Sequence, residues 1–313
     1  MTTWETEEGA DDFRDLVAPH VSELHRHCYR MLGSVDDADE VLQETLLAAW
    51  QGLSGFEGRA SPRTWLFRIA TNRCLNAIRD GKRRPPLVPA PPFEPPWPTE
   101  HHRATWIQPY PTPDPAQAHE RREHIELAFV SALQLLPPRQ CAALLLVDVL
   151  GFSLSEAADL LGSGATAIKG LLQRARAGVE GRREEVERPS PPAQNAVAER
   201  FASAFSADDI DGVLALLTDR AWLAMPPAPH LYRGHDAIGA FLEASIAWRR
   251  GSRVVSLTPL RANAAPGFAV RLSGPDGWQP GGVIVLELVP DGILGITRFL
   301  GESGLPHRRL PVL

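Results

Sequence analysis

The sequence contains few cysteines and no long hydrophobic run. Its 313 residues include three cysteines that are widely separated, odd in number and without a metal-binding or disulfide spacing: Cys28, Cys74 and Cys141. We therefore expect structural thiols and no metal site, and nothing in the sequence indicates a cofactor. No apolar run approaches the roughly 20 residues of a membrane-spanning helix. The acidic N-terminus also lacks the basic start and apolar core of a secretory signal. These absences predict a cytoplasmic protein with no membrane partner.

Charge is unevenly distributed along the chain. The formal net charge of −6 argues weakly against a general nucleic-acid binder. However, the stretch from Asp36 to Glu44 has five acids and no cation, whereas the stretch from Arg63 to Arg84 has seven cations and one acid. This local asymmetry indicates two surfaces of opposite sign, which the total charge conceals.

The chain divides into four segments by composition and periodicity. Residues 10–84 and 116–186 have apolar residues at helical spacing, residues 85–115 are rich in proline, and residues 193–313 contain strands rich in Val, Ile and Leu. The length is consistent with two or three domains. We predict two all-α domains, the second with a helix-turn-helix, followed by an α+β domain whose helices precede an antiparallel meander.

Local signals place some boundaries of these elements. Ser61 followed by Pro62 predicts a helix start, and Ser34, Asp36 and Asp37 are candidate caps for the preceding helix. Pro-Gly, Pro-Asp-Gly and Asp-Gly sequences predict the turns of the C-terminal meander.

Residues 85–115 allow two interpretations. Their prolines exclude a helix, which favours a semi-extended linker between domains. Alternatively the segment packs as an ordered loop on a neighbouring domain, because Trp97, Trp106 and Tyr110 are costly to leave exposed.

Residues 153–183 have the pattern of a helix-turn-helix. Gly162 lies between two short amphipathic helices and can adopt the positive φ of a tight turn. Ala165, Ile168, Leu171 and Leu172 are predicted as the buried stripe of the second helix. A helical hairpin without DNA-binding function has the same apolar spacing, but the basic end of the second helix favours DNA. The side chains expected to face bases and phosphates are Ser163, Thr166, Lys169, Gln173, Arg174 and Arg176.

Two charged stretches precede the helix-turn-helix, and each has a functional and a structural interpretation. In "DDADEVLQET" the acids form either a solvated helix start, stabilised by the helix dipole, or a docking face for a basic partner. In "RASPRTWLFRIATNRCLNAIRDGKRR" the cations suit a phosphate backbone, and Trp65 and Phe67 could stack on unpaired bases. The alternative is an amphipathic helix with a solvated cationic face and core aromatics.

Three motifs in this order resemble RNA polymerase sigma factors of the extracytoplasmic-function (ECF) group. "DDADEVLQETLLAAW" resembles the polymerase-docking helix, "SPRTWLFRIATNRCLNAIRDGKRR" the helix that engages and opens the −10 promoter element, and "ALQLLPPRQCAALLLVDVLGFSLSEAADLLGSGATAIKGLLQRARA" the domain that reads the −35 element. The resemblance covers residues ~10–84 and ~116–183. It implies two partners, promoter DNA and core RNA polymerase, the latter through the clamp of the largest subunit and the flap of the second. It also implies that residues 85–115 run through the polymerase toward the RNA path.

The resemblance further implies roles for individual residues. It favours the docking interpretation of the acids, with Asp39, Glu40, Gln43 and Glu44 facing the polymerase clamp. The residues implied for the −10 element are Arg63, Trp65, Arg68, Asn72, Asn76, Arg79, Lys82, Arg83 and Arg84. Because Gly164, Ala165 and Gly170 lack long polar side chains, −35 recognition is expected to depend partly on DNA shape.

The C-terminal segment resembles a SnoaL-like domain, a cone-shaped α+β fold of the nuclear-transport-factor kind. The matching stretches are "MPP" and "RGHDAI" within residues 205–242. The fold implies a pocket that could hold a small ligand, lined here by Trp222, His230, Tyr232 and Asp236. Enzymes of this fold use His or Asp as acid or base, for which Asp219, His230, His235 and Asp236 are available. We expect no catalysis and instead a domain that regulates the sigma factor in cis.

Two alternatives to a sigma factor remain at this stage. One is a small-molecule enzyme or sensor of the SnoaL-like fold tethered to DNA. The other is an ordinary helix-turn-helix regulator that acts independently of polymerase.

Overall fold

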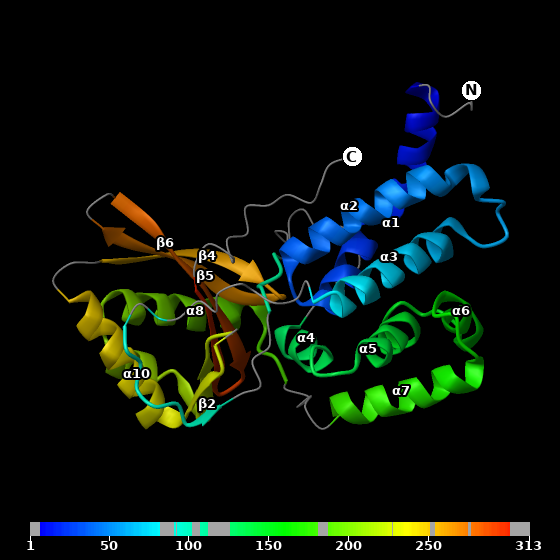
Figure 1. Cartoon of the computed structure of the whole chain (residues 1–313). Helices are drawn as coiled ribbons and strands as arrows, with labels where there is room; N and C mark the ends of the chain where they lie inside the picture. The colour runs from blue at the N-terminus through cyan, green and yellow to red at the C-terminus, as the bar shows by residue number, and fades with distance from the viewer. Residues whose placement is uncertain are drawn as a thin grey trace. The chain divides into compact units, whose positions relative to one another are not determined.

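A computed structural model describes residues 7–81, 91, 93–101, 107–111, 126–180, 187–226, 228–250, 254–274 and 277–300. They form two compact units (Figure 1). The helical unit contains the described residues of 1–84 and 128–183, and the sheet unit those of 85–127 and 184–308. No helix in the described ranges is long and apolar enough to span a membrane.

The helical unit begins with three helices, here called the first bundle: α1 (Glu7–Leu32), α2 (Val35–Gly52) and α3 (Pro62–Arg79). The expected starts of α2 and α3 are confirmed, because Ser34 Oγ accepts from Asp37 N (3.1 Å) and Ser61 caps α3 with Pro62 in its first turn. A short 3-10 turn, Leu53–Gly55, follows α2. Apolar residues of all three helices are fully buried between them, among them Leu24, Leu42 and Leu66.

The rest of the helical unit is the helix-turn-helix domain. It consists of α4 (Leu127–Leu133), α5 (Pro138–Leu144) with a π-helical turn (Leu145–Val149), α6 (Leu154–Leu160) and α7 (Ala165–Glu180). Gly162 has the expected positive φ of 56° at the turn. The buried stripe of α7 contains Ile168 and Leu172. Ala165, which was predicted to belong to this stripe, is exposed instead.

The sheet unit is an α+β domain. Its elements are α8 (Pro191–Ser206), α9 (Ile210–Leu214), β2 (Leu217–Ala224), β3 (His230–Arg233), α10 (Gly234–Arg249), β4 (Val255–Ala262), β5 (Ala265–Gly274), β6 (Gly277–Val289) and β7 (Gly292–Phe299). With β1 (Glu100–His101), these strands form a seven-stranded sheet in the order β1-β3-β2-β7-β6-β5-β4. Among the described residues, β2 and β7 are the only neighbouring strands that pair in parallel. The fold class predicted from the sequence is confirmed.

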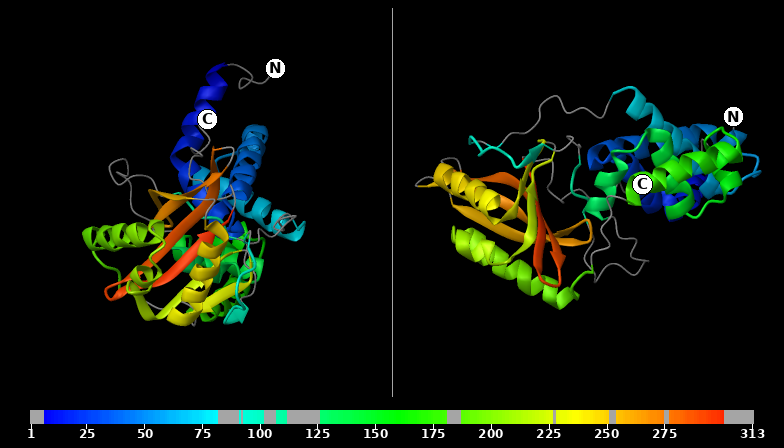
Figure 2. Two further views of the ribbon diagram at one scale, coloured as in Figure 1. Left: turned by 90° about the vertical axis from the view of Figure 1, so that its left-hand side faces the viewer. Right: turned by 90° about the horizontal axis from the view of Figure 1, so that it is seen from below.

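The sheet curves around its helices (Figure 2). α8 packs on β4 and β5, and α10 packs on β2 and β3 near the other end of the sheet. One apolar core nevertheless includes Phe201 of α8, Phe241 of α10 and Ile284 of β6. Val283 and Val285, which alternate with Ile284 along β6, form a second apolar cluster on the opposite face.

One predicted turn of the meander is wrong. Pro266 and Gly267 lie within β5, and the reversal between β4 and β5 falls at Asn263 and Ala264 instead. Both turn residues have positive φ (52° and 61°), as a two-residue hairpin turn requires. Asparagine tolerates this conformation better than most residues. The Asn263 side chain also binds the backbone of Tyr110.

The three cysteines lie closer together than their sequence positions indicate. All are buried and none is in a disulfide. Cys28 of α1 and Cys74 of α3 are hydrogen-bonded, and Cys141 of α5 is near enough to affect Cys74. Burial, reinforced by these neighbouring thiols, raises the pKa of Cys74 well above its usual range.

We expect these thiols to be unreactive in the folded chain. The thiolate is the reactive form, and burial disfavours both the thiolate and access to it. Ellman's reagent should therefore modify the native protein at least about a hundredfold more slowly than the protein in urea. Rapid release of one equivalent of chromophore from the native protein would contradict this expectation.

Candidate nucleic-acid interface

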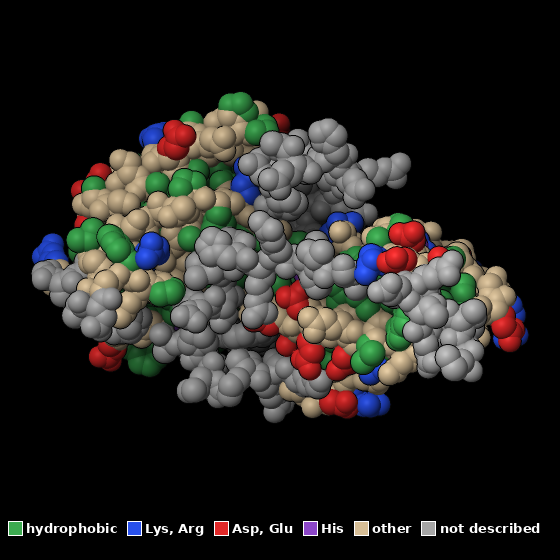
Figure 3. Space-filling view, turned by 90° about the horizontal axis from the view of Figure 1, so that it is seen from above, with side chains coloured by type: hydrophobic (Ala, Val, Ile, Leu, Met, Phe, Trp, Pro, Cys, Tyr) green, Lys and Arg blue, Asp and Glu red, His purple; other side chains and the backbone are tan. Residues whose placement is uncertain are grey.

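The acidic face of α2 contains three of the four residues predicted to dock on polymerase. Glu40 and Gln43 are exposed, and Glu44 is half-buried with an ion pair to Arg73 (3.4 Å). Leu47 follows them at helical spacing and is 58% exposed, so the face also offers an apolar side chain to solvent. Acidic side chains gather over the helical unit in Figure 3. Leu47 was not among the predicted docking residues, although its spacing from Glu40, Gln43 and Glu44 places it on their face of the helix.

Asp39 has a different environment from the other three. Its carboxylate contacts His25 Nε2 (3.0 Å), and its side chain is only 16% exposed. Burial, partly offset by Asp39, lowers the pKa of His25. Asp39 therefore helps to hold α2 on α1, so its substitution would disturb the bundle as well as any docking surface.

The residues predicted for the −10 element fall into separate groups on α3. Arg68, Asn72, Asn76 and Arg79 are exposed, and their spacing of four, four and three residues places them on one face. Trp65 is buried and stacks on Phe56 with ring centroids 4.7 Å apart, so it is not available to stack on bases in this structure. Phe67 is likewise fully buried, as the core interpretation expected. Lys82, Arg83 and Arg84 lie outside the described residues.

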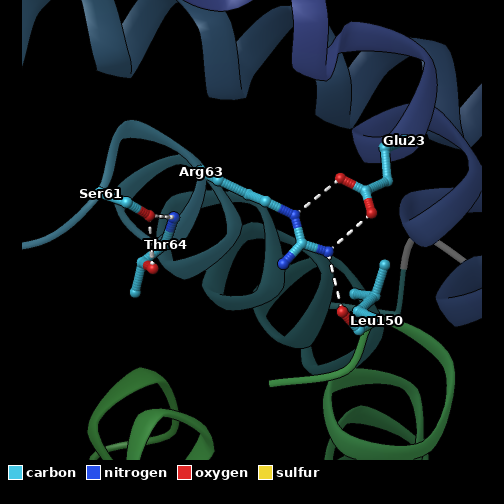
Figure 4. A network of polar contacts seen from close by, with 5 residues as sticks. All are labelled: Glu23, Ser61, Arg63, Thr64 and Leu150. Atoms are coloured by element: carbon cyan, nitrogen blue, oxygen red, sulfur yellow. Dashed lines mark hydrogen bonds and ion pairs between the residues drawn. The ribbon is translucent and has the colours of Figure 1, made fainter. Parts of the chain in front are cut away.

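Arg63 also departs from its prediction. It points away from the exposed face of α3 and forms two hydrogen bonds with the Glu23 carboxylate, at 2.9 and 2.7 Å (Figure 4). Its Nη2 also donates to the Leu150 carbonyl of the helix-turn-helix domain (2.9 Å). These partners occupy the guanidinium, so Arg63 does not belong to the DNA-facing set in this structure.

The helix-turn-helix presents its predicted polar residues to solvent. Thr166, Lys169, Gln173 and Arg174 are exposed along α7, and Ser163 is half-buried just before it. Arg176 is about half exposed but forms two hydrogen bonds with Asp148, at 2.9 and 2.7 Å. The turn itself is fixed by Arg139, which donates to the Leu161 carbonyl (2.8 Å).

The four candidate pocket residues of the sheet unit do not converge. Leu223 and Tyr232 are register partners in the helix-side core, so Trp222, next to Leu223, points to the other face. There the ring of Trp222 lies over Gly295, where any side chain would collide with it. Asp236 is exposed in the first turn of α10, and His230 is half-buried beside Tyr232.

The described residues of the proline-rich segment pack on the sheet unit. The Phe93 ring lies 5.6 Å from Phe241 and 6.0 Å from Trp248, measured between centroids. Tyr232 Oη donates to the Pro96 carbonyl (2.9 Å), and β1 adds an edge strand to β3. Burial raises the pKa of Tyr232 to about 12, so its hydroxyl remains a donor at neutral pH.

A second attachment lies at the β4–β5 turn. Asn263 Oδ1 accepts from the Tyr110 amide, and the Asn263 amide donates to the Tyr110 carbonyl, both at 2.9 Å. Ile107 is buried in the cluster with Val283 and Val285. These contacts fit the ordered-loop interpretation for residues 93–101 and 107–111. The argument from aromatic exposure holds for the buried Tyr110 and fails for Trp97, which is 90% exposed. Trp106 lies outside the described residues.

Known proteins resemble both halves of the helical unit. Residues 16–84 match the Sigma-70 region 2 family, and residues 126–177 match the Sigma-70 region 4 family. The ECF RNA polymerase sigma factor SigG of Mycobacterium tuberculosis is 40% identical over 97% of this chain and 85% of its own length. The chain belongs to the ECF RNA polymerase sigma factors. The resemblance seen in its motifs is thereby confirmed, and the protein directs core RNA polymerase to promoter DNA.

The likeness extends through the C-terminal part of this sigma factor. SigJ of M. tuberculosis is 29% identical over 68% of this chain and 67% of its own length. The crystal structure of the M. tuberculosis ECF sigma factor SigJ has the same overall fold, with a TM-score of 0.64 and 22% identity over 94% of this chain and 97% of that one. The sheet unit of the sigma factor has the α+β fold that the sequence predicted.

Proposed function

We propose that this ECF sigma factor uses three helical faces to bring polymerase to a promoter. The exposed face of α2, formed by Glu40, Gln43 and Leu47, docks on the clamp of the largest polymerase subunit, and the helix-turn-helix domain meets the flap of the second. The exposed face of α3 engages the −10 element, and α7 reads the −35 element. What supports this assignment is that each predicted set, apart from its buried members, lies on one solvent-facing side of one helix.

The SnoaL-like domain regulates transcription and does not catalyse a reaction in this proposal. The scatter of Trp222, Tyr232 and Asp236 over different surfaces argues against an acid–base site at these residues. The hydroxyl of Tyr232, moreover, already binds the Pro96 carbonyl. Because the sigma factor acts on polymerase, we place it in the cytoplasm.

The domain regulates by holding the proline-rich segment between the two promoter-binding domains. In the family this segment is expected to run through the polymerase toward the RNA path. A segment bound at Phe93, Pro96 and Tyr110 to the sheet unit cannot follow that path at the same time. Polymerase and the SnoaL-like domain therefore compete for one stretch of chain, and the balance between them sets the activity of the sigma factor.

A pair of glycine substitutions at the β4–β5 turn tests this competition. Asn263→Gly keeps the positive φ of the turn but removes the side chain that holds Tyr110, whereas Ala264→Gly changes the neighbouring turn residue without touching that bond. We expect Asn263→Gly to increase hydrogen exchange over residues 107–111 by about tenfold, because the lost hydrogen bond contributes about 1 kcal/mol or more to holding this segment. Promoter-specific transcription by reconstituted holoenzyme should change at least about threefold.

The control variant should resemble the wild type in both measurements. If Asn263→Gly loosens residues 107–111 without altering transcription, the hold on the segment has no regulatory role. If the wild type itself does not support transcription with core polymerase, the assignment of the helical faces is at fault rather than the competition.

A further inference from the structure

The two promoter-binding domains are packed against each other within the helical unit, and Arg63 lies at their junction. Its guanidinium carbon is 5.2 Å from the Phe67 ring centroid of the first bundle and 4.5 Å from that of Phe152 in the helix-turn-helix domain. The two rings themselves meet edge to face at 5.6 Å. Through Nε and Nη2, which bind Glu23 and Leu150, and through the two ring contacts, the Arg63 guanidinium contacts both domains (Figure 4).

The acceptor in the helix-turn-helix domain is the carbonyl of Leu150, the residue that caps the π-helical turn. The turn ends at Val149, Leu150 follows it, and Gly151 reverses the chain with φ of 73°. Such carbonyls carry partial negative charge and are stabilised by a cation. Arg63 supplies that cation from the other domain.

A second contact repeats this arrangement in the opposite direction. Gln134 of the helix-turn-helix domain donates through Nε2 to the carbonyl of Arg30 (3.0 Å), which lies in the last turn of α1. Each domain thus caps a helix end of the other. Such complementary partners indicate a specific closed arrangement.

This closed arrangement is too small for a promoter. A compact unit of about 130 residues has a radius of gyration of about 14 Å and a diameter of roughly 40 Å. Elements centred at −35 and −10 are about 25 base pairs apart, which is about 85 Å at about 3.4 Å per base pair. One domain cannot reach its element while the other holds its own unless the junction opens.

We propose that Arg63 is the latch of a closed, promoter-incompetent state of this sigma factor. Its contacts to Leu150 and Phe152 hold the helix-turn-helix domain on the first bundle, and binding of core polymerase breaks them. The proposal rests on the promoter-element assignments made above. It gives Arg63 a role between the domains in place of the DNA contact that the sequence predicted.

Hydrogen exchange of the full-length chain tests the latch, with Arg63→Gln as the variant. Arg68→Gln is the matched control, because Arg68 is an exposed arginine on the same helix. We expect Arg63→Gln to increase exchange over residues 127–136 and 145–153 by about tenfold, the effect of losing a charged hydrogen bond and a cation–π contact at a partly exposed site. Gln134→Ala should loosen the same two segments to a lesser degree, and Arg68→Gln should not.

The same measurement on holoenzyme shows whether polymerase opens the latch. In complex with core polymerase, the wild type should lose protection over residues 145–153, as the free Arg63→Gln variant does. The variant should also bind core about tenfold more tightly, because less of its population is closed. If Arg63→Gln leaves both segments as protected as in the wild type, or if they stay protected in holoenzyme, the latch is refuted.

Two other outcomes distinguish a failure of the latch from unfolding of the first bundle and from a failure of the proposed docking face. Raised exchange throughout α1, α2 and α3 would mean that losing the Glu23 pair has unfolded the first bundle, and Gln134→Ala then decides the question, because it acts from the other domain. A wild-type chain that does not bind core at all would count against the proposed docking face. The free-chain comparison of Arg63→Gln with Arg68→Gln stands either way.

Discussion

Reversing the charge of Glu40 and truncating Leu47 should together weaken binding to core polymerase by about a hundredfold or more. Central residues of an interface each contribute about 2 kcal/mol or more, which is roughly a thirtyfold change in Kd. Glu40 supplies charge for steering and pairing, and Leu47 supplies apolar area that is 58% exposed before docking. Fluorescence anisotropy of labelled Glu40→Lys, Leu47→Ala and the double variant with purified core gives the affinities directly.

The choice of Glu40 rather than Asp39 matters for this test. Asp39 contacts His25 and is mostly buried, so its reversal would place a cation beside His25 and weaken the α1–α2 packing. Glu40 is exposed, and its substitution should leave the bundle folded. Glu199→Lys on α8 is a control with the same change in net charge on the sheet unit. Wild-type affinity of Glu40→Lys and Leu47→Ala would show that the chain docks through a different surface.

The first bundle should lose stability steadily as the pH falls below about 6.5. His27 is fully buried, its Nε2 contacts Thr71 Oγ1 at 3.0 Å, and its pKa is lowered to about 3, mainly by burial and secondarily by Arg30. Since the folded pKa lies below the unfolded value of about 6.5, the unfolded chain binds the extra proton between these two pH values. Acidification in that window therefore favours unfolding, by about 1.4 kcal/mol per pH unit for this group.

Between pH 6.5 and 4.5 the expected loss from His27 is about 2 kcal/mol, which is a considerable share of a typical domain stability of about 5–15 kcal/mol. Urea unfolding followed by far-UV circular dichroism at several pH values measures it. His27→Gln keeps a polar group opposite Thr71 but does not titrate in this range. The pH slope of the variant should be shallower than that of the wild type by about 1.4 kcal/mol per unit. Equal slopes would exclude His27 as the responsible group.

The sequence by itself determined the helices, their order and the family. Ser34, Ser61 and Gly162 mark boundaries through local chemistry, namely a side-chain oxygen for orphan amides or a residue that accepts positive φ, and local chemistry does not depend on distant parts of the chain. The exposed residues of α3 and α7 were likewise predictable, because helical periodicity separates the polar face from the buried one.

Tertiary structure decided which of these residues remain available. Arg63 and Arg68 were both predicted to contact the −10 element, yet one is bound to Glu23 and Leu150 and the other is exposed. Trp65 is buried and stacks on Phe56, which lies outside its helix. These outcomes depend on contacts with other elements, and periodicity contains no information about such partners.

The same reason explains why the sequence did not predict the cluster of cysteines or the contacts of the proline-rich segment. Three thiols on α1, α3 and α5 meet because these helices pack together. Residues 93–101 and 107–111 are held by the β3 edge of the sheet and by the Asn263 turn. Composition correctly indicated a segment that cannot form a helix. Only long-range packing decided that the C-terminal domain of this sigma factor holds it, and that its two promoter-binding domains lie closed on each other.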